Sequence, residues 1–431
     1  MPPTATLSPS PSEFRRAVPD PTAAPPSRAP APRAAAAERH ALQGRRVAIV
    51  GASLGGLCLA RLLQLRGAVV ELHEASSASD PAWYRRTLSI EHERDLAALQ
   101  GAELGPLFDR CCVRERVATR LVDPQGRRQR DGAVPARAAL QWRIEYGLLR
   151  DLLLGALPPG TVQWGRRFSS LTAAADGSQR LNFANGSRAH ADLVVGADGE
   201  CSLLRPYATD HGLRYAGVTL IESQVALPEL RVPRLALWLD RDRLAVRDAD
   251  AALVVQRNSQ RGLDLRLGLR VPRDWSQRGV DWTDSMQVRA LLRQRLAHWD
   301  SKFLHLIDAA EPRFAARALL TSAPDRAWNE RSGSTLLGAA ARLAPSLLSD
   351  RKAFELHDAA ELADALTAPR HGSIAAALAD YERGLLTRAA RDGRDAQRSL
   401  TALLPQGSVA GGAWRSLGRS LGAFAGRLLP R

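Results

Sequence analysis

The sequence is short of cysteine, of lysine and of long apolar runs, and each shortage excludes a class of protein. Its four cysteines, Cys58, Cys111, Cys112 and Cys201, show no C-x-x-C spacing, so we expect neither a disulfide framework nor a zinc site. No stretch reaches the roughly 20 apolar residues that a membrane-spanning helix needs. The N-terminus lacks the pattern of a secretory signal. These shortages predict a reduced, cytoplasmic protein.

The excess of basic charge does not by itself indicate a nucleic-acid partner. The formal net charge is +15, yet only Lys302 and Lys352 are lysines, and the arginines are scattered mostly singly or in pairs. Nucleic-acid binders usually concentrate such charge on one face or tail. Hydrophobic residues make up 45% of the chain and charged residues 24%, which is ordinary for a globular protein. The length of 431 residues suits two or three domains, and no nucleic-acid partner is predicted.

The first regular pattern is a strand, turn, helix and strand that follow a Pro- and Ala-rich start. Residues 1–43 hold almost no large apolar side chains, which predicts a disordered tail. Residues 46–50 form a β-branched apolar run, and residues 57–65 carry apolar side chains at helical spacing. Residues 68–74 are a second strand-like run. This order predicts a βαβ unit.

The turn after the first strand has the spacing of a dinucleotide-binding fingerprint. Its glycines allow a tight turn, close approach of the backbone to a pyrophosphate and close packing of helix on strand, and the helix N-terminus favours negative charge. Ser53 stands at the middle glycine position, where its Cβ crowds a phosphate while its hydroxyl can donate to one. Glu74 follows about twenty residues on, as a ribose acceptor does. A merely structural turn is the alternative. The predicted nucleotide-binding residues are Gly51, Ala52, Ser53, Gly55, Gly56 and Glu74.

A second motif, at 192–205, runs from an apolar strand into Gly196-Ala-Asp-Gly199 and on to Ser202 and Arg205. It is similar to the Asp-Gly motif of flavoprotein hydroxylases. Together with residues 336–345 it makes the chain resemble the FAD-dependent, aromatic-hydroxylase type of monooxygenase, and most closely its tetracycline-inactivating subgroup. The resemblance implies that Asp198 and Gly199 contact FAD and the nicotinamide cofactor. The alternative is a hairpin that ends in an acidic turn.

The resemblance implies an α/β fold in which a parallel-sheet, Rossmann-like FAD/NAD(P)-binding domain is interrupted by an antiparallel-sheet α+β substrate domain. The FAD-binding domain is expected at 44–206, the substrate domain at 207–320, and the return segment with its helices at 321–400. Residues 263–271 alternate strictly, as a strand with one buried face does. Residues 401–431 have the pattern of a basic amphipathic helix that either touches a membrane surface weakly or packs back on the domain.

The activity implied by the resemblance is hydroxylation of a small cyclic or aromatic molecule. NADPH reduces FAD, oxygen then forms a flavin C4a-hydroperoxide, and the protein excludes water and positions the substrate. The histidines show no metal-like spacing. Arg85 and Arg86 either meet a phosphate of the nicotinamide cofactor or are solvated surface charges. The residues predicted to line the substrate pocket are Gln224, Trp238, Val255, Arg257 and Leu267.

The chain also departs from the family in its third motif. Gly338 and Pro345 are kept and are predicted to contact FAD, but Ala339 stands where the family has the aspartate that holds the ribityl chain. Losing one charged hydrogen bond costs about 1.5–3 kcal/mol. The loop that normally reads Gly-x-Gly-x-Asn is Ser-Asp-Arg-Lys-Ala at 349–353, so side chains stand where bare backbone approaches the flavin ring.

Two further departures affect the same half of the cofactor site. Tyr146 aligns with an arginine at the start of a helix, for which Arg143 is a candidate substitute, and Ser89 aligns with an aspartate. Two functions follow. Either the chain is a monooxygenase that holds FAD through other residues, among them Arg342, Arg351 and Lys352, or it is a non-catalytic descendant that binds a ligand or a protein.

Overall fold

The computed structural model describes residues 41–77, 87–90, 92–132, 134, 137–174, 176–210, 212–322, 328, 333–348 and 353–405, which all fall within one structural unit, 40–431. Arg85, Arg86, residues 349–352 and the tail from 406 onward lie outside the described residues, so the predictions made for them are not addressed. Leu42, which falls within the segment 1–43 predicted as a tail, is buried in the core.

Five parallel strands form the sheet that contains the predicted βαβ unit. Strand β1 pairs with β11 on one side and with β2 on the other. The last four residues of β1 are all buried, because a parallel sheet is covered on both faces. In spatial order the strands are β17 (Ser334–Leu336), β11 (Leu193–Gly196), β1 (Arg46–Val50), β2 (Val69–His73) and β7 (Val162–Gln163).

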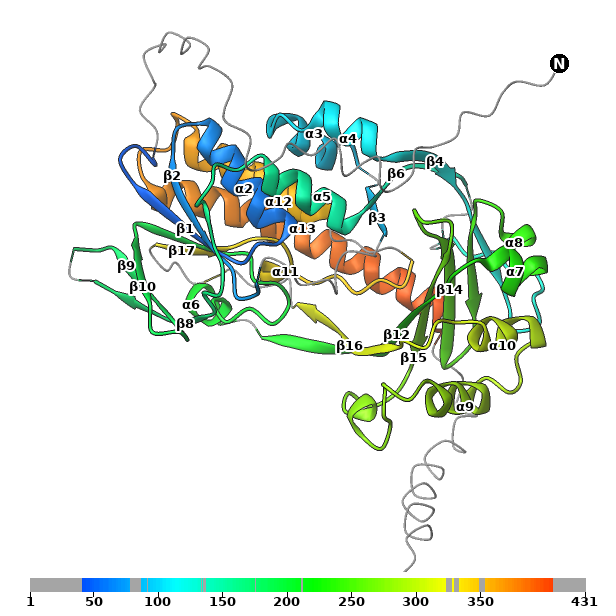
Figure 1. Cartoon of the computed structure of the whole chain (residues 1–431). Helices are drawn as coiled ribbons and strands as arrows, with labels where there is room; N and C mark the ends of the chain where they lie inside the picture. Colours follow the sequence, from blue (N-terminus) through cyan, green and yellow to red (C-terminus); the bar gives the residue numbers. More distant parts are fainter. Residues whose placement is uncertain are drawn as a thin grey trace, which may run out of the picture. The chain divides into compact units, whose positions relative to one another are not determined.

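Ser53 is the N-cap of helix α2 (Leu54–Leu65), and its Oγ accepts a hydrogen bond from the amide of Gly56 at 3.2 Å. Its buried leucines pack beside the sheet and against α12, which comes almost 300 residues later in the chain (Figure 1). The other helices of this part are α3 (Glu93–Gly101), α4 (Gly105–Cys111), α5 (Tyr146–Gly155), α6 (Arg205–Ala208), α11 (Gly338–Ala341), α12 (Phe354–Thr367) and α13 (Ile374–Leu403).

Two small antiparallel sheets complete this part. In one of them the Asn185-Gly186 turn joins β9 to β10. Residues 188–191 extend this hairpin before the chain enters the parallel sheet as β11. The small sheets are β10–β9–β8, formed by Arg188–Ala191, Gln179–Phe183 and Phe168–Ala173, and β3–β6–β4, formed by Thr87–Ile90, Ala139–Glu145 and Val113–Val117.

A six-stranded sheet forms the second part, and the predicted α/β fold with an antiparallel second sheet is confirmed. Its neighbouring strands are antiparallel except for β5, which is parallel to β13. Strand β5 comes from within the segment 44–206, so that segment contributes to both large sheets. In spatial order the strands are β16 (Ala315–Ser322), β12 (Leu213–Val225), β15 (Leu263–Leu269), β14 (Ala251–Arg257), β13 (Arg243–Arg247) and β5 (Thr119–Val122).

The two faces of this sheet have different neighbours. On one face, Val255 and Leu267 belong to a core that also contains apolar side chains of the helices between 228 and 308. On the other face, Leu220 and Val254 pack with Leu403 near the end of α13, which extends from the parallel sheet to this one (Figure 1). The covering helices are α7 (Pro228–Arg231), α8 (Pro233–Leu239), α9 (Ser285–Arg295) and α10 (Ser301–Asp308), with a short 3-10 turn at Trp275–Gln277.

Candidate functional site

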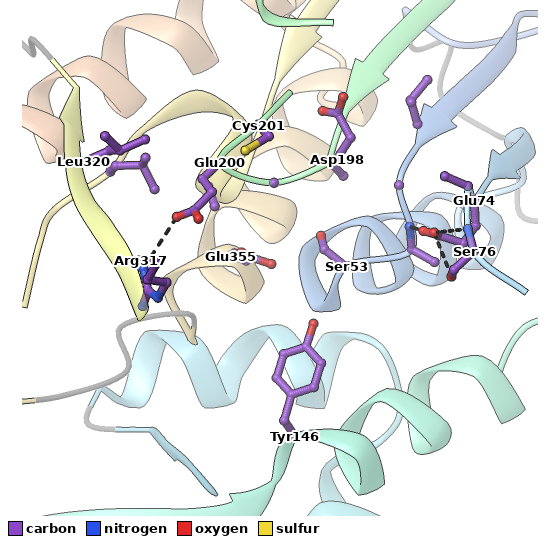
Figure 2. Close-up of a pocket in the computed structure, with 18 of the residues that line it drawn as sticks. Ser53, Glu74, Ser76, Tyr146, Asp198, Glu200, Cys201, Arg317, Leu320 and Glu355 are labelled. Carbon is purple, nitrogen blue, oxygen red and sulfur yellow. Dashed lines mark hydrogen bonds and ion pairs between the residues drawn. The ribbon is translucent and has the colours of Figure 1, made fainter. Parts of the chain in front are cut away.

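A cavity of about 630 Å³ lies where the ends of β1, β2 and β11 face the six-stranded sheet. Its volume is within the range of small-molecule and cofactor sites. Figure 2 shows its length: Glu74 and Ser76 lie at one end, Arg317 and Glu200 at the other, and Ser53 and Glu355 between them. Glu74 and Asp198, which come from different motifs, therefore line one common cavity.

Glu74 anchors the end of the cavity next to β2. Its Oε2 accepts from the amide of Ala52 at 2.7 Å, and its Oε1 accepts from the amide and the hydroxyl of Ser76 at 2.8 and 2.9 Å. Three arginines also line the cavity, namely Arg150, Arg166 and Arg167. The backbone amide of Arg166 donates to the carbonyl of Glu74 at 2.8 Å. His73 also lines the cavity. Burial, together with the nearby charge of Arg166, lowers its pKa to about 4.

The turn between β1 and α2 requires glycine at two positions. Gly51 has a φ of +104°, and a Cβ there would lie 2.5 Å from the carbonyl oxygen of Ala197. A Cβ on Gly56 would lie 2.3 Å from the carbonyl oxygen of Gly51. The two glycines thus allow β1, α2 and the loop after β11 to approach one another, and the cavity opens above that contact.

The loop after β11 brings a polar acceptor and open backbone to the cavity wall. Asp198 Oδ2 accepts from the amide of Leu203 at 2.9 Å, whereas its buried Oδ1 has no hydrogen-bond partner among the described residues. Burial raises the pKa of the Asp198 carboxyl, against the effect of hydrogen bonds from Ser202 and from backbone amides. Gly199 has a φ of +84°, and a Cβ there would meet no atom within 4 Å.

The N-terminus of α2 faces a carboxylate of the chain itself. Glu355, in the first turn of α12, is only 4% exposed, and its Oε2 accepts from the amide of Gly55 at 3.4 Å. Figure 2 shows Glu355 beside the start of α2, close to Ser53. Both residues line the cavity at its middle.

Known proteins resemble this chain in sequence and in fold. No family model matches the chain. It is 32% identical to a 3-amino-4-hydroxybenzoate 2-monooxygenase of Streptomyces platensis over 209 residues, which are 45% of this chain and 50% of that protein. It is 27% identical to a 6-hydroxynicotinate 3-monooxygenase of Bordetella bronchiseptica over 371 residues, which are 81% of this chain and 90% of that protein. The match to the Streptomyces protein thus spans only half of its length.

A solved structure extends the likeness to the whole described fold. HpxO of Klebsiella pneumoniae, complexed with FAD and uric acid, superposes with a TM-score of 0.69 at 20% identity, over 88% of this chain and 94% of that one. The chain is thus similar in sequence to these two monooxygenases and similar in fold to an FAD-complexed protein.

The third sequence motif, residues 336–345, forms another part of the cavity wall. Gly338, with a φ of +59°, begins α11, and Ala339 and Pro345 line the cavity. Arg205 ties this loop to the loop after β11, because its guanidinium donates to the carbonyls of Ala340 at 2.8 Å and Ala339 at 3.3 Å. These bonds hold the loop in place, although Ala339 has no polar side chain.

Arg342 does not lie at the cavity, which corrects its expected role near a flavin. Its guanidinium is buried, pairs with Asp358 at 3.1 Å and also with Asp392, and stacks on the ring of Phe354. Those two carboxylates raise the pKa of Arg342 although burial opposes them. Arg342 therefore joins α12 to α13, and its charge is neutralised by its own neighbours.

Arg143 is likewise absent from the cavity, whereas Tyr146 lines it. The buried guanidinium of Arg143 pairs with Glu115 at 2.8 Å, next to Ser89 on the neighbouring strand β3. Figure 2 shows Tyr146 with its ring directed toward the cavity. Because Arg143 precedes Tyr146 by three residues and lies on β6 rather than on α5, it faces a different part of the structure.

The far end of the cavity carries a network of opposite charges. Arg317 lies 3.4 Å from Glu222 and 3.6 Å from Glu200, and Arg266 lies 3.9 Å from Glu222. Leucines at 220, 319 and 320 line the same end. The wall beside the six-stranded sheet thus combines apolar surface with paired charges.

The residues predicted as substrate walls are not brought together at this cavity. Val255 and Leu267 lie on the face of the sheet that points away from the cavity. Side chains alternate along a strand, so the neighbouring residue Arg266 lines the cavity instead of Leu267. Trp238 and Arg257 line a separate surface depression beside α8. Gln224 donates to Asp264 at 3.0 Å on the cavity-facing side of β12 but does not line the cavity.

Of the predicted cofactor residues, most share the cavity or support it. Gly55, Gly56 and Gly338 lie beneath its surface. The members that line it are Gly51, Ala52, Ser53, Glu74, Asp198, Gly199 and Pro345. The sequence reasoning missed Glu355, since an acid in the first turn of a helix is normally interpreted as favourable to that helix alone.

Among the described residues, no group of three or more potential metal ligands gathers, and none of the described helices is long and apolar enough to cross a membrane.

Proposed function

We propose that this chain is a monooxygenase that binds FAD and uses NADPH to hydroxylate a small cyclic or aromatic molecule. The observation that supports it best is the common cavity of Glu74 and Asp198, which continues to the wall formed by Glu222 and Arg266. An extended dinucleotide needs such a continuous path from a ribose acceptor to a separate substrate wall.

The residues at the adenosine end fit the cofactor. Gly51 and Gly56 create a turn that side chains would block, and Glu74 offers carboxylate oxygens to a ribose. The buried Oδ1 of Asp198 is an acceptor with no partner among the described residues, beside the open backbone of Gly199. A hydroxyl-rich linker supplies the donors that such an acceptor lacks.

The middle of the cavity fits less well. Ala339 offers no side-chain hydrogen bond, and Glu355 brings negative charge to the α2 N-terminus. FAD binding in this chain therefore depends on Glu74, Asp198 and backbone groups, and we expect weaker affinity than in a relative with an acid at position 339.

When bound, FAD supplies the redox chemistry with oxygen, and the protein supplies position and exclusion of water. The leucines at 220, 319 and 320 shield the substrate end, and Arg266 and Arg317 offer charge to a polar group on the ring. The two relatives act on aminohydroxybenzoate and hydroxynicotinate, which are rings bearing such groups.

The test uses the purified full chain incubated with excess FAD. We expect a yellow protein that oxidises NADPH faster when 6-hydroxynicotinate or 3-amino-4-hydroxybenzoate is added, and a hydroxylated product by mass spectrometry. Asp198→Ala should weaken FAD binding about tenfold or more, while Asp176→Ala, in an exposed turn, should not. A chain that takes up no FAD would refute the proposal.

The second candidate function is a non-catalytic ligand- or protein-binding scaffold. Ala339 and the carboxylate of Glu355 favour it, because both weaken the grip on a flavin dinucleotide. The absence of FAD uptake, together with a thermal shift on addition of a nucleoside, would support it over the enzyme.

A further inference from the structure

Glu355 is placed between the N-termini of two helices. It lies in the first turn of α12, and its Oε2 faces the amide of Gly55 in the first turn of α2. Figure 2 shows the same arrangement, with the carboxylate beside Ser53. Helix N-termini favour negative charge, so two dipoles stabilise a carboxylate at this position.

The stem of Glu355 is held by glycine backbones. A Cβ on Gly338 would lie 2.6 Å from Cγ of Glu355, and a Cβ on Gly55 would lie 2.9 Å from its Cβ. The residue therefore occupies a space that exists only because both neighbours lack side chains. The carboxylate accepts from the amide of Gly55 at 3.4 Å, which is longer than an ordinary amide–oxygen hydrogen bond.

The chain's own oxygens already accept from most of the amides with which this turn would bind an anion. Ala52 donates to Glu74, Gly55 donates to Glu355, and Gly56 donates to Ser53. In a dinucleotide site the pyrophosphate lies on these helix N-terminal amides. A phosphate and the Glu355 carboxylate would carry like charges in one place, which is unfavourable.

We propose that Glu355 is a tethered competitor of the nucleotide diphosphate: its carboxylate must leave the N-terminus of α2 before a diphosphate-bearing ligand can bind there. The inference rests on the nucleotide site of the proposed function and not on the hydroxylation. It makes residue 355 a determinant of which nucleotides the cavity accepts, because it reduces the preference for a nucleoside diphosphate over a nucleoside.

Calorimetric titration of the full chain with adenosine, ADP and FAD tests this. In the wild type we expect ADP to bind no more than about threefold more tightly than adenosine, because the gain from the phosphates is offset. Glu355→Gln keeps an oxygen for Gly55 but removes the charge. It should tighten ADP and FAD binding about tenfold and leave adenosine unchanged.

Glu361→Gln is the matched control, since Glu361 lies on the same helix with 45% of its side chain exposed and pairs with Arg388. It should change no affinity by more than about twofold. Equal tightening of ADP binding in both variants would overturn the proposal, as would no tightening in Glu355→Gln. If Glu355→Gln unfolds, the titrations of the wild type still test the proposal. Binding of ADP more than tenfold tighter than that of adenosine would overturn it, and so would the absence of binding of both ligands.

These outcomes separate the two proposals. A colourless chain whose preference for ADP rises on removal of the charge would refute the monooxygenase and leave the role of Glu355 standing. A yellow, active chain whose preference for ADP is unchanged by substitution of residue 355 would support the monooxygenase and refute the role of Glu355.

Discussion

Single carboxylates decide much of what this cavity can hold. Glu74 and Glu355 each accept a hydrogen bond from a backbone amide of the same turn. Glu74 does so from the end of β2, and Glu355 does so from the start of α12. The first is compatible with a nucleotide and the second opposes its phosphates. Two residues of one type thus have opposite effects because of where the fold places them.

Asp95 is a buried acid that offers a test at the residue scale. It lies in the first turn of α3 with 2% exposure, and its Oδ1 has no hydrogen-bond partner among the described residues. Burial raises its pKa to about 7, and the negative charges of Asp358 and Asp392 add to the effect. The folded chain therefore holds this proton more tightly than the unfolded chain does.

The sign of the pH dependence follows from this shift. Between about pH 4 and pH 7 the folded state binds more protons, so the contribution of Asp95 to stability falls as the pH rises through that window. Asp95→Asn should raise the free energy of unfolding at pH 8 by about 4 kcal/mol at most, since one pKa unit corresponds to about 1.4 kcal/mol. The gain should vanish near pH 4.

Urea unfolding followed at several pH values measures this prediction. Glu93→Gln changes an exposed acid in the same helical turn and should leave the profile as it is. A gain for Asp95→Asn that is equally large at pH 4 and pH 8 would show that charge is not its cause.

At the scale of the element, the contact between β1 and α2 depends on Gly56. Helix propensity alone predicts that Gly56→Ala stabilises the chain by about 1 kcal/mol. The steric clash opposes this gain, because the added Cβ would lie 2.3 Å from the carbonyl oxygen of Gly51. A backbone oxygen in a sheet-to-helix turn cannot move freely. We expect a net loss of about 1–3 kcal/mol.

Gly155→Ala is the control for this prediction. Gly155 ends α5, and a Cβ there would meet nothing within 4 Å, so the substitution should be neutral or slightly stabilising. Chemical denaturation of both variants gives the comparison. Equal stability of the two would mean that the turn adjusts at little cost.

At the scale of the whole described fold, α13 connects the two large sheets. Its end packs Leu400 and Leu403 against the six-stranded sheet, and Arg270 donates to the carbonyl of Leu404 at 2.6 Å. Near its middle, Asp392 pairs with Arg342, which comes six residues after strand β17 of the parallel sheet. One helix therefore couples the stability of both parts.

Leu403→Ala tests this coupling. The side chain is fully buried, so its truncation should cost about 2–5 kcal/mol. Because the lost contacts lie between the two parts, we also expect the thermal unfolding transition to broaden or divide in calorimetry. Leu237→Ala, at a residue 84% exposed, should leave a single unchanged transition. A sharp transition in Leu403→Ala would show that other contacts maintain the cooperativity.

Local patterns sufficed to predict the elements that bear the nucleotide-type turn. The apolar run at 46–50, the glycines after it and the acid at 74 depend on backbone sterics and on neighbours close in sequence, and the described structure has the expected strand, turn and helix there. The same holds for the strand before Asp198.

Tertiary structure alone decided how the rest of the cavity is lined. Gly55 and Glu355 are 300 residues apart in sequence, and no periodicity reports such a pair. Strand alternation showed that Leu263 to Leu269 has two faces but not which one meets the cavity, and the packing of α9 and α10 placed Leu267 on the other side. Charges such as Arg342 acquire a role only when their partners are known, because pairing depends on position in space and not in sequence.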